Sequence, residues 1–282
     1  MTLCFGSHVS IAGGVCNAIE HAERIGCDSF QIFVKPNRQW KLPNITDDDA
    51  DFFYKKASDF SIYPVAHSSY LLNLASSNEA TLCKSVDTLV AELEACDSLR
   101  IKNLVLHPGS HGGDGEDVGL QRIVDSLAVV FNRFSGKCNI CLELTAGTGF
   151  NLGYKFEHIS WILKNGPAEN LSVCLDTAHV FGAGYDISNE ERYKEIESSF
   201  EDLIGWDNLK CLHLNDSKCE LGSRKDRHEH IGKGLIGLSG FENILSTCKN
   251  FKIPAIIETP KGKSDDFDKL NLKILRDINC KV

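Results

Sequence analysis

The sequence predicts an α/β fold, a TIM (β/α)8 barrel with its active site at the C-terminal mouth of the strands. Two observations support this prediction. Eight short β-rich runs alternate with longer segments in which apolar residues recur at helical spacing. Near-continuous apolar strands separated by helices indicate a parallel sheet covered on its outside, and eight such units close a barrel. An open, doubly wound sheet is the alternative on pattern alone.

The predicted strands follow one another at intervals that leave room for a helix. They are residues 2–8, 28–34, 63–68, 102–108, 139–145, 171–177, 209–216 and 253–260. The clearest helical segments between them are 78–99 and 118–134, and many of the helical segments open on Asp, Ser or Asn as cap candidates.

The bulk composition indicates one globular unit. Hydrophobic residues make up 42% and charged residues 24% of 282 residues, and no linker or low-complexity tract divides residues 1–282, so a single barrel domain is expected. No apolar run approaches the roughly 20 residues that cross a bilayer. The N-terminus reads directly into a strand, without a secretory or transit signal.

Twelve cysteines lie scattered through hydrophobic runs, where a free thiol behaves as a small apolar group. Cys138 and Cys141 form one CxxC pair, but residues three apart in a strand point to opposite faces, so we interpret both as core. An intracellular, reducing compartment is therefore expected: the cytoplasm of a bacterium, or otherwise a nucleus or mitochondrion.

Imidazole and carboxyl side chains end six different predicted strands. In a barrel the C-terminal strand ends converge on one mouth, so these residues become neighbours in space. His179 follows one of them closely, and the loop after the seventh strand adds two more potential ligands. The nine residues are His67, His107, Glu143, Asp176, His179, His213, Asp226, His228 and Glu258.

Five imidazoles and four carboxylates in one cleft require cations, because the carboxylates repel one another and desolvated charges lack partners. Such ligands suit Zn²⁺ or a similar ion at about three protein ligands each, so nine ligands serve three ions, and Glu143 can bridge two. Any one of these histidines taken alone is better explained as a hydrogen-bonded core residue. His8 is interpreted as structural or as a residue that supports the ligands from behind, and the other histidines as surface or loop residues (His21, His111, His158, His230).

Closely spaced metal ions favour hydrolysis of a phosphate ester, because they activate water and stabilise both the entering and the leaving oxygen. The sequence contains no P-loop, GxSxG elbow or Cys-His nucleophile motif that would indicate another mechanism.

Three long motifs carry a family resemblance: HSSYLLNLA (67–75), VCLDTAH (173–179) and LHLNDSKCELGSRKDRH (212–228), which runs on into HIGKG. Over essentially its whole length the chain resembles endonuclease IV, a family of metal-dependent apurinic/apyrimidinic DNA repair nucleases. Ala178 stands where relatives often have Cys, and Leu72 replaces a usual Ile, Val or Met; neither is a predicted ligand.

The resemblance implies a barrel with three Zn²⁺ ions, with Mn²⁺ as an alternative at some positions. It assigns His67, His107 and Glu143 to one ion, and Glu143, Asp176, His213 and Glu258 to a second. His179, Asp226 and His228 would bind the third. It also implies catalytic roles for Glu143 and Glu258 and a metal-bound hydroxide as nucleophile.

The substrate implied by the resemblance is double-stranded DNA with an abasic site, cut 5′ to the lesion to leave a 3′-hydroxyl and a 5′-deoxyribose phosphate. Trimming of blocked 3′ ends and a monomeric state are also implied. A base-free nucleotide is easy to flip out, because little pairing and stacking is lost. Arg38 in NRQW (37–40) and Tyr70 and Leu71 in SYLLN (69–73) match the family's minor-groove loops and would wedge the duplex open.

The formal net charge of −9 argues against a nucleic-acid partner when taken alone. Three divalent ions would change it to −3, and the helix segment 195–202 and a predicted acidic loop at 45–52 place acidity away from the mouth. Basic residues on predicted mouth loops can contact phosphates: Lys35, Arg38, Lys41, Lys218, Arg224, Lys225, Arg227 and Lys233. The Gly-rich loops 109–119 and 145–153 either admit the DNA backbone or are flexible turns.

Two other functions remain open at this point. A sugar isomerase or epimerase with the same barrel also gathers His, Asp and Glu at strand ends around divalent ions, and fold alone does not exclude it. A non-catalytic binder of damaged DNA would be expected to have lost ligands, whereas all nine are present.

Overall fold

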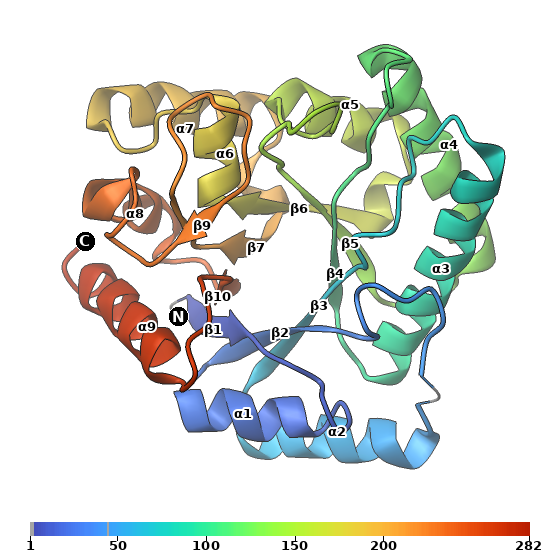
Figure 1. The fold of residues 1–282 in the computed structure, drawn as a ribbon, viewed down its shortest axis with the longest axis horizontal. Coiled ribbons are helices and arrows are strands. Elements are labelled where there is room, and N and C mark those ends of the chain that lie inside the picture. The colour runs from blue at the N-terminus through green and yellow to red at the C-terminus, as the bar shows by residue number, and fades with distance from the viewer. Residues whose placement is uncertain (1–2, 44) are drawn as a thin grey trace.

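The computed structural model describes residues 3–43 and 45–282 and shows a closed parallel barrel in the order β1-β10-β7-β6-β5-β4-β3-β2 (Figure 1). Because β1 pairs with both β2 and β10, the sheet has closed on itself, and the open-sheet alternative is wrong. All eight predicted strands are confirmed. They are β1 (Cys4–His8), β2 (Ser29–Phe33), β3 (Tyr63–His67), β4 (Asn103–Leu106), β5 (Asn139–Glu143), β6 (Leu171–Asp176), β7 (Leu209–His213) and β10 (Pro254–Ile257).

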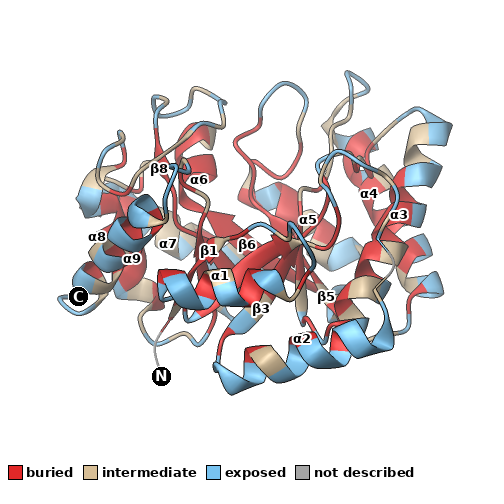
Figure 2. Cartoon of the chain, turned by 60° about the horizontal axis from the view of Figure 1, so that its bottom comes forward, coloured by how far each residue is buried: buried red, intermediate tan, exposed pale blue. Residues whose placement is uncertain are grey.

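Helices surround the barrel, with their inward faces buried and their outward faces exposed (Figures 1 and 2). The predicted helical segments 78–99 and 118–134 are confirmed as α3 and α4, and the Asn78 side chain caps α3 by accepting a hydrogen bond from Thr81 N. The helices are α1 (Asn17–Ile25), α2 (Asp47–Asp59), α3 (Glu79–Ser98), α4 (Glu116–Arg133), α5 (Phe156–Asn165), α6 (Thr177–Ala183), α7 (Glu190–Leu203), α8 (Gly237–Cys248) and α9 (Asp266–Asn279), with short 3-10 turns at Ala168–Asn170 and Trp206–Asn208.

The acidic segment 45–52 is not the loop that the sequence predicted, because most of it forms the first turns of α2. Thr46 caps this helix by accepting from the backbone N of Asp49, and the Asp49 side chain accepts from the backbone N of Thr46. Three aspartates in the first turn also interact favourably with the positive end of the helix dipole. The acidity therefore stabilises a helix start on the outside of the barrel.

Six buried side chains form their own apolar cluster, separate from the larger core between strands and helices. This lower layer consists of Val65, Val105, Cys141, Cys174, Cys211 and Ile256, each fully buried. Cys138 belongs to the larger core instead, so the CxxC pair does point to opposite faces as predicted. All twelve cysteines lie in the described part of the chain and are free thiols.

A short antiparallel hairpin follows β7, where the sequence predicted only a loop. It pairs β8 (Asp216–Ser217) with β9 (His228–Glu229), and Lys218 N donates to Arg227 O at 2.9 Å to extend the pairing. The Asp216 carboxylate holds the returning chain, because it accepts from the backbone N of Gly234 and of Ile236, both at 3.0 Å. The hairpin thereby fixes the ends of the loop that carries Asp226.

Within the described residues, no helix is both long enough and apolar enough to span a bilayer.

Candidate metal centre

Glu143 lies at the centre of a cluster at the barrel mouth. Its Oε2 is 3.1 Å from Nε2 of His67 and 2.9 Å from Nε2 of His107. Its Oε1 is 3.0 Å from Nδ1 of His213 and 3.2 Å from Nδ1 of His179. The two oxygens of one fully buried carboxylate therefore face different sets of imidazoles, as a carboxylate that bridges two ions would.

The cluster extends from His213 to two further carboxylates. Nδ1 of His213 lies 3.5 Å from Oε2 of Glu258 and 3.7 Å from Oδ2 of Asp176. That same Asp176 oxygen is 3.6 Å from Nε2 of His228. Asp226 completes the arrangement, with Oδ1 3.1 Å from Nε2 of His228 and Oδ2 3.2 Å from Nε2 of the His179 ring. The structure thus brings all nine predicted residues into one connected cluster.

Three sets of ligand atoms in this cluster are close enough to hold an ion, with every atom of a set within 4.8 Å of the others. The sets are His67, His107 and Glu143; Glu143, Asp176 and His213; and Asp176, His179 and His228. The first equals a predicted set, while Glu258 lies beside the second and Asp226 beside the third. His213 also forms a set with Cys174 and Cys211 of the lower layer.

In four of the five histidines, one ring nitrogen is hydrogen-bonded to a backbone carbonyl or to Gln31. In three of them Nδ1 donates to a backbone carbonyl, so that Nε2 would carry the lone pair for an ion. In His179 this Nδ1 also lies 3.2 Å from Oε1 of Glu143. Such outer partners fix the tautomer and orientation of metal-binding histidines. The pairs are His67 with Ser68 O at 2.7 Å, His179 with Leu144 O at 3.1 Å and His228 with Glu258 O at 3.2 Å.

His213 is oriented by a side chain, Gln31, which sequence reasoning missed. Gln31 is fully buried in β2, and its Oε1 accepts from Nε2 of His213 at 2.8 Å. Its amide nitrogen donates to Oε1 of Glu258 at 2.7 Å and lies 3.0 Å from Nδ1 of His8. The signal was present in the sequence, because an amide interrupts the apolar run SFQIF. His8, predicted to be structural or to support the ligands, lies with its Nδ1 3.5 Å from the Glu258 carboxylate.

Asp176 has two roles at once. Its Oδ1 caps α6 by accepting from His179 N at 3.0 Å, which is the ordinary explanation for an Asp near a His. Its Oδ2 faces the cluster and accepts from Nδ2 of Asn215 at 2.7 Å. Asn215 also accepts from Glu258 N at 2.7 Å through its Oδ1, so this one amide holds two of the carboxylate residues. The sequence placed Asn215 inside a motif but gave it no role.

Opposite charges control the protonation of the cluster. Burial alone would raise the pKa of Glu143, but the facing imidazoles, led by His107, hold that pKa well below its usual range. Burial alone would lower the pKa of His228, but Asp176 and Asp226 raise it to about 9. Without a metal, the carboxylates therefore favour protonated imidazoles at His67, His179, His213 and His228, whose pKa values are all raised.

The residues present fit a metal centre. Nε2 of His228 is buried and has no hydrogen-bond partner among the described residues, although the Asp226 carboxylate lies 3.1 Å away. A buried ring nitrogen without a hydrogen bond is costly, and a metal ion that replaced its proton would satisfy it. Imidazole and carboxylate donors together suit zinc or a related first-row ion.

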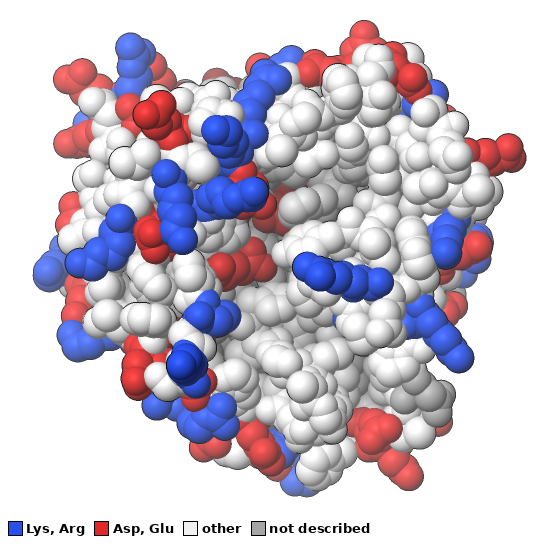
Figure 3. All heavy atoms as spheres, in the orientation of Figure 1, with Lys and Arg blue, Asp and Glu red and all other residues white. Residues whose placement is uncertain are grey.

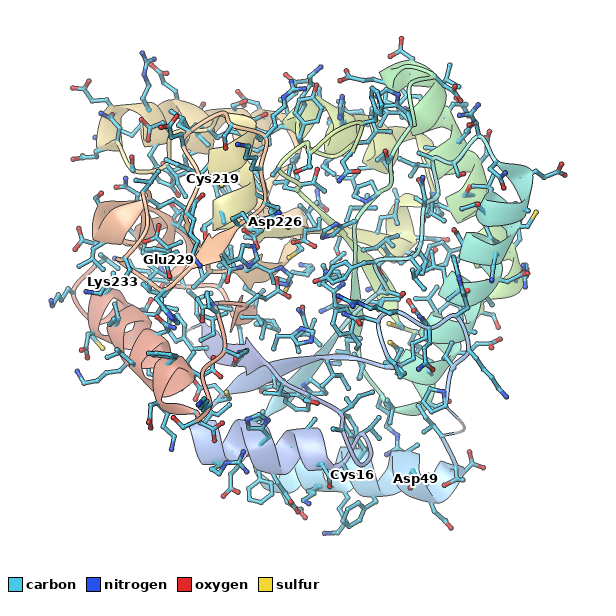
Figure 4. The ribbon with its side chains drawn as sticks, in the orientation of Figure 1. Cys16, Asp49, Cys219, Asp226, Glu229 and Lys233 are labelled. Carbon is cyan, nitrogen blue, oxygen red and sulfur yellow. The ribbon has the colours of Figure 1, made fainter. Side chains whose placement is uncertain are left out.

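The cluster opens into a cavity of about 490 Å³ at the mouth. Its walls include His67, Tyr70, His107, Asn151, His179 and Asp226. Figure 3 shows the hollow at the centre of this face, with acidic atoms inside it and basic side chains along part of its rim. Asp226 lies beside the opening, while Glu229 and Lys233 of the same segment lie farther out (Figure 4).

The three residues predicted to contact DNA lie on two loops at this mouth. Arg38 is exposed in a turn after β2 that is closed by Gln39 N donating to Pro36 O at 3.0 Å. Tyr70 follows β3 and is 57% exposed, although its ring packs 5.3 Å from that of His67. Leu71 is half-buried. Their contact with DNA stays a prediction.

One of the predicted phosphate contacts is wrong. Lys35 is 1% exposed and forms an ion pair with Glu92 at 3.1 Å, because its side chain turns inward beneath the loop after β2. The other seven basic residues are exposed, as predicted: Arg38, Lys41, Lys218, Arg224, Lys225, Arg227 and Lys233.

Among the remaining histidines, His158 is buried, which corrects the prediction of a surface or loop role. Its Nε2 lies 3.2 Å from Oε2 of Glu116, and its Nδ1 accepts from Gly153 N at 3.2 Å, so this α5 ring supports a mouth loop from below. His21, His111 and His230 are partly exposed, as predicted.

The two Gly-rich loops bind each other. Ser110 and Asn151 form an antiparallel bridge, and Leu152 N donates to Gly109 O at 2.8 Å. Gly109 has a φ of +134°, and a Cβ there would lie 2.7 Å from Oδ1 of Asn73, so the close approach requires glycine. The loops are therefore ordered against each other at the rim of the cavity.

Comparison with known proteins adds four similarities. Residues 19–277 match the family described as xylose isomerase-like TIM barrel. A probable endonuclease 4 from Geotalea daltonii is 44% identical over 278 residues, 97% of each chain. The crystal structure of endonuclease IV from Thermus thermophilus superimposes with a TM-score of 0.87 at 31% identity, covering 99% of this chain and 100% of that one. A D-tagatose 3-epimerase-like protein shares the fold alone, at a TM-score of 0.72 and 18% identity over 99% of each chain.

Proposed function

The chain belongs to the xylose isomerase-like TIM barrel family and, within it, to the endonuclease IV proteins, and from this premise we propose that it is a DNA repair endonuclease. It hydrolyses the phosphodiester 5′ to an abasic site in duplex DNA, leaving a 3′-hydroxyl and a 5′-deoxyribose phosphate, and trims blocked 3′ ends. The observation that carries this proposal is the position of Glu143, whose two oxygens face separate sets of imidazoles. Residues 1–282 act as one domain and as a monomer in this proposal.

The cluster would hold three zinc ions, with Mn²⁺ as an alternative at some positions. The assignment is His67, His107 and Glu143 for one ion, Glu143, Asp176, His213 and Glu258 for the second, and His179, Asp226 and His228 for the third. When bound by these residues, zinc would supply a lowered pKa of water and neutralise the charge of a phosphodiester. In this scheme Glu143 and Glu258 are the catalytic carboxylates, because both lie beside His213 in the cluster that would hold the ions.

The protein's own residues supply orientation and selectivity. Backbone carbonyls and Gln31 keep four imidazoles in one tautomer, so that their lone pairs stay aimed at the centre. Arg38, Tyr70 and Leu71 enter the minor groove at the base-free position and hold the duplex open. The exposed basic residues of the rim contact backbone phosphates. An abasic nucleotide is selected because turning it out of the helix disrupts little stacking.

A sugar epimerase is the alternative from the same fold, and the site disfavours it. The similarity to an epimerase-like structure at 18% identity extends to the barrel only. The cluster gathers nine donors, more than one or two ions need. An exposed arginine and tyrosine at the rim are also better suited to a duplex than to a small sugar.

We propose a reducing compartment for this protein, because the twelve free thiols include pairs that lie on neighbouring strands, such as Cys174 and Cys211.

The direct test is nicking of a labelled duplex with one abasic site, with metal analysis of the same preparation. The expected result is about three zinc ions per chain and a single cut 5′ to the lesion, lost on chelation and restored by Zn²⁺. An intact duplex of the same sequence is the control. Turnover of a ketose instead of DNA, or nicking that persists with no bound metal, would contradict the proposal.

A further inference from the structure

A fully buried ion pair lies beneath the two loops that carry Arg38 and Tyr70. Nζ of Lys35 is 3.1 Å from Oε1 of Glu92, and each side chain is 1% exposed. Neither residue belongs to the metal cluster. Two charges removed from water are costly unless their remaining polar atoms are also satisfied, so the partners of this pair indicate what it does.

On one side the pair holds the turn that presents Arg38. Nζ of Lys35 donates to the backbone carbonyl of Gln39 at 2.6 Å. The carbonyl of Asn37 accepts from Oγ of Ser69 at 2.9 Å. The carbonyls immediately before and after Arg38 are therefore both tied down, while the Arg38 side chain itself is exposed.

On the other side the pair holds the residue that precedes Tyr70. The backbone N of Ser69 donates to both carboxylate oxygens of Glu92, each at 3.3 Å. Oγ of Ser69 in turn accepts from Leu71 N at 3.3 Å. A continuous set of hydrogen bonds thus runs from the Arg38 turn through Lys35 and Glu92 to the Tyr70 loop.

A helix anchors both loops. Glu92 lies in α3, and Nζ of Lys84 from the same helix lies 4.4 Å from the ring centre of Trp40, next to the Arg38 turn. The loop after β2 and the loop after β3 are therefore both held against the same rigid helix, α3.

We propose that Lys35 and Glu92 are positioning residues that fix the Arg38 and Tyr70 loops relative to each other, so that both engage a lesion-bearing duplex together. This inference rests on the proposed function. Loops already ordered in the bound geometry lose little conformational freedom on binding, so the pair strengthens substrate binding without touching the substrate. Loss of the pair should weaken binding to abasic DNA and leave the metal cluster intact.

The experiment compares Lys35→Met, Glu92→Leu and the double variant on an abasic duplex under steady-state conditions. KM should rise between about 10- and 100-fold, because a loop displaced by about 1 Å loses its geometry with the substrate. The kcat value should change by less than about threefold, since no side chain in contact with the reacting atoms is altered. Zinc per chain should equal that of the wild type.

The double variant separates positioning from folding. Each single variant leaves one uncompensated buried charge and should lower the thermal midpoint, whereas the double variant buries an apolar pair and should recover it. The hydrogen bonds to Gln39 O and Ser69 N stay lost, so its KM should stay high. Ser69→Ala should raise KM less than the double variant does. The exposed pair Lys55 and Asp59, replaced by Met and Leu, is the matched control and should leave KM unchanged.

Wild-type KM in a folded double variant would overturn the positioning role, and so would a KM rise accompanied by loss of zinc. A double variant that binds intact and abasic duplexes equally weakly, with full zinc, supports it. If the wild-type protein itself does not nick abasic DNA, the proposed function fails. Failure of the positioning role alone would leave wild-type nicking intact, so the two failures can be told apart.

Discussion

The mouth of the barrel and the layer directly beneath it differ in chemistry, although the same six strands supply both. Each residue of the lower layer lies two positions before a residue of the metal cluster. The pairs are Val65 and His67, Val105 and His107, Cys141 and Glu143, Cys174 and Asp176, Cys211 and His213, and Ile256 and Glu258. Because side chains two apart in a strand share a face, both layers point into the lumen, and the mouth layer lies one pair of residues higher along the strands.

This comparison shows that, on each strand, the residue that stabilises the barrel lies two positions before the residue that belongs to the cluster at the mouth. The lower layer is fully buried and apolar, so it contributes the hydrophobic free energy that closes the lumen. The mouth layer collects charges, which by themselves oppose burial. The lower layer therefore supports a polar cluster that is unfavourable on its own, and changes in the two layers should have different consequences.

The largest effect is expected for Glu143→Gln, which keeps the shape of the side chain and removes its charge. Cleavage of abasic DNA should fall by about 10³-fold or more, because the charge shared between two sets of imidazoles is lost. Single-turnover kinetics on a labelled duplex measure this. Cys141→Val, two positions lower on the same strand, is the matched control and should retain cleavage. Equal losses in both variants would contradict the separation of the layers.

The converse change is Ile256→Ala in the lower layer. It should lower the free energy of unfolding by about 2–5 kcal/mol, because a large side chain is removed from a fully buried site. Urea titration measures the loss, while zinc content and kcat per folded molecule should match the wild type. A variant that stays fully stable but loses zinc would show that the layers are not separate.

Gln31→Leu tests the residues that support the mouth from the side. His213 loses the acceptor for its Nε2–H and Glu258 loses a donor, so zinc affinity should fall about 10- to 100-fold. Competition with a chromogenic chelator measures the affinity. Gln121→Leu on the exposed face of α4 is the control, and unchanged affinity in the Gln31 variant would contradict the orienting role.

The smallest expected effect is the change of thermal stability with pH in the metal-free protein. The pKa of His228 is raised from 6.5 to about 9, so its stabilising contribution is complete below pH 6.5 and is lost as the pH rises through about 9. Asp226 and Glu258 have lowered pKa values, so their contributions are lost as the pH falls into the acid range. The thermal midpoint of chelator-treated protein should therefore decrease between pH 6.5 and 9.5.

Two variants test the source of that pH effect. His228→Gln should make the decrease smaller, because the titrating imidazole is gone, whereas His230→Gln should leave it unchanged. An identical decrease in all three proteins would assign the effect to other groups.

The sequence predicted what depends on local pattern and on strand ends. Runs such as NICLE and LSVCLD are apolar enough to identify a buried strand, and parallel strands in a barrel bring Glu143 and Asp176 together. The gathering of six strand-end residues at one mouth followed from these two rules, and the other three were placed there because they follow two of those strands. The roles of those residues in binding metal and DNA stay predictions.

The sequence could not show the direction of a side chain once the strand has ended. Lys35 follows β2 by two residues and turns inward to Glu92, which lies far along the chain on α3. Gln31 reaches His213 across the lumen through a contact that no periodicity encodes. The strands β8 and β9 have two residues each, too short for any repeating pattern. The chain after β9 is held by the Asp216 contacts to Gly234 and Ile236, which no local pattern predicts.

The pairing of β1 with β10 places a constraint on how the molecule is made. Cys4 pairs with Pro254 and Ser7 with Ile257, so β1 waits for its second neighbour until synthesis has passed Ile257. Until then β1 and β7 each keep an unpaired edge, the kind of surface that joins to other chains. Contacts between such distant segments also slow folding, so the nascent chain should depend most on chaperones just before β10 emerges.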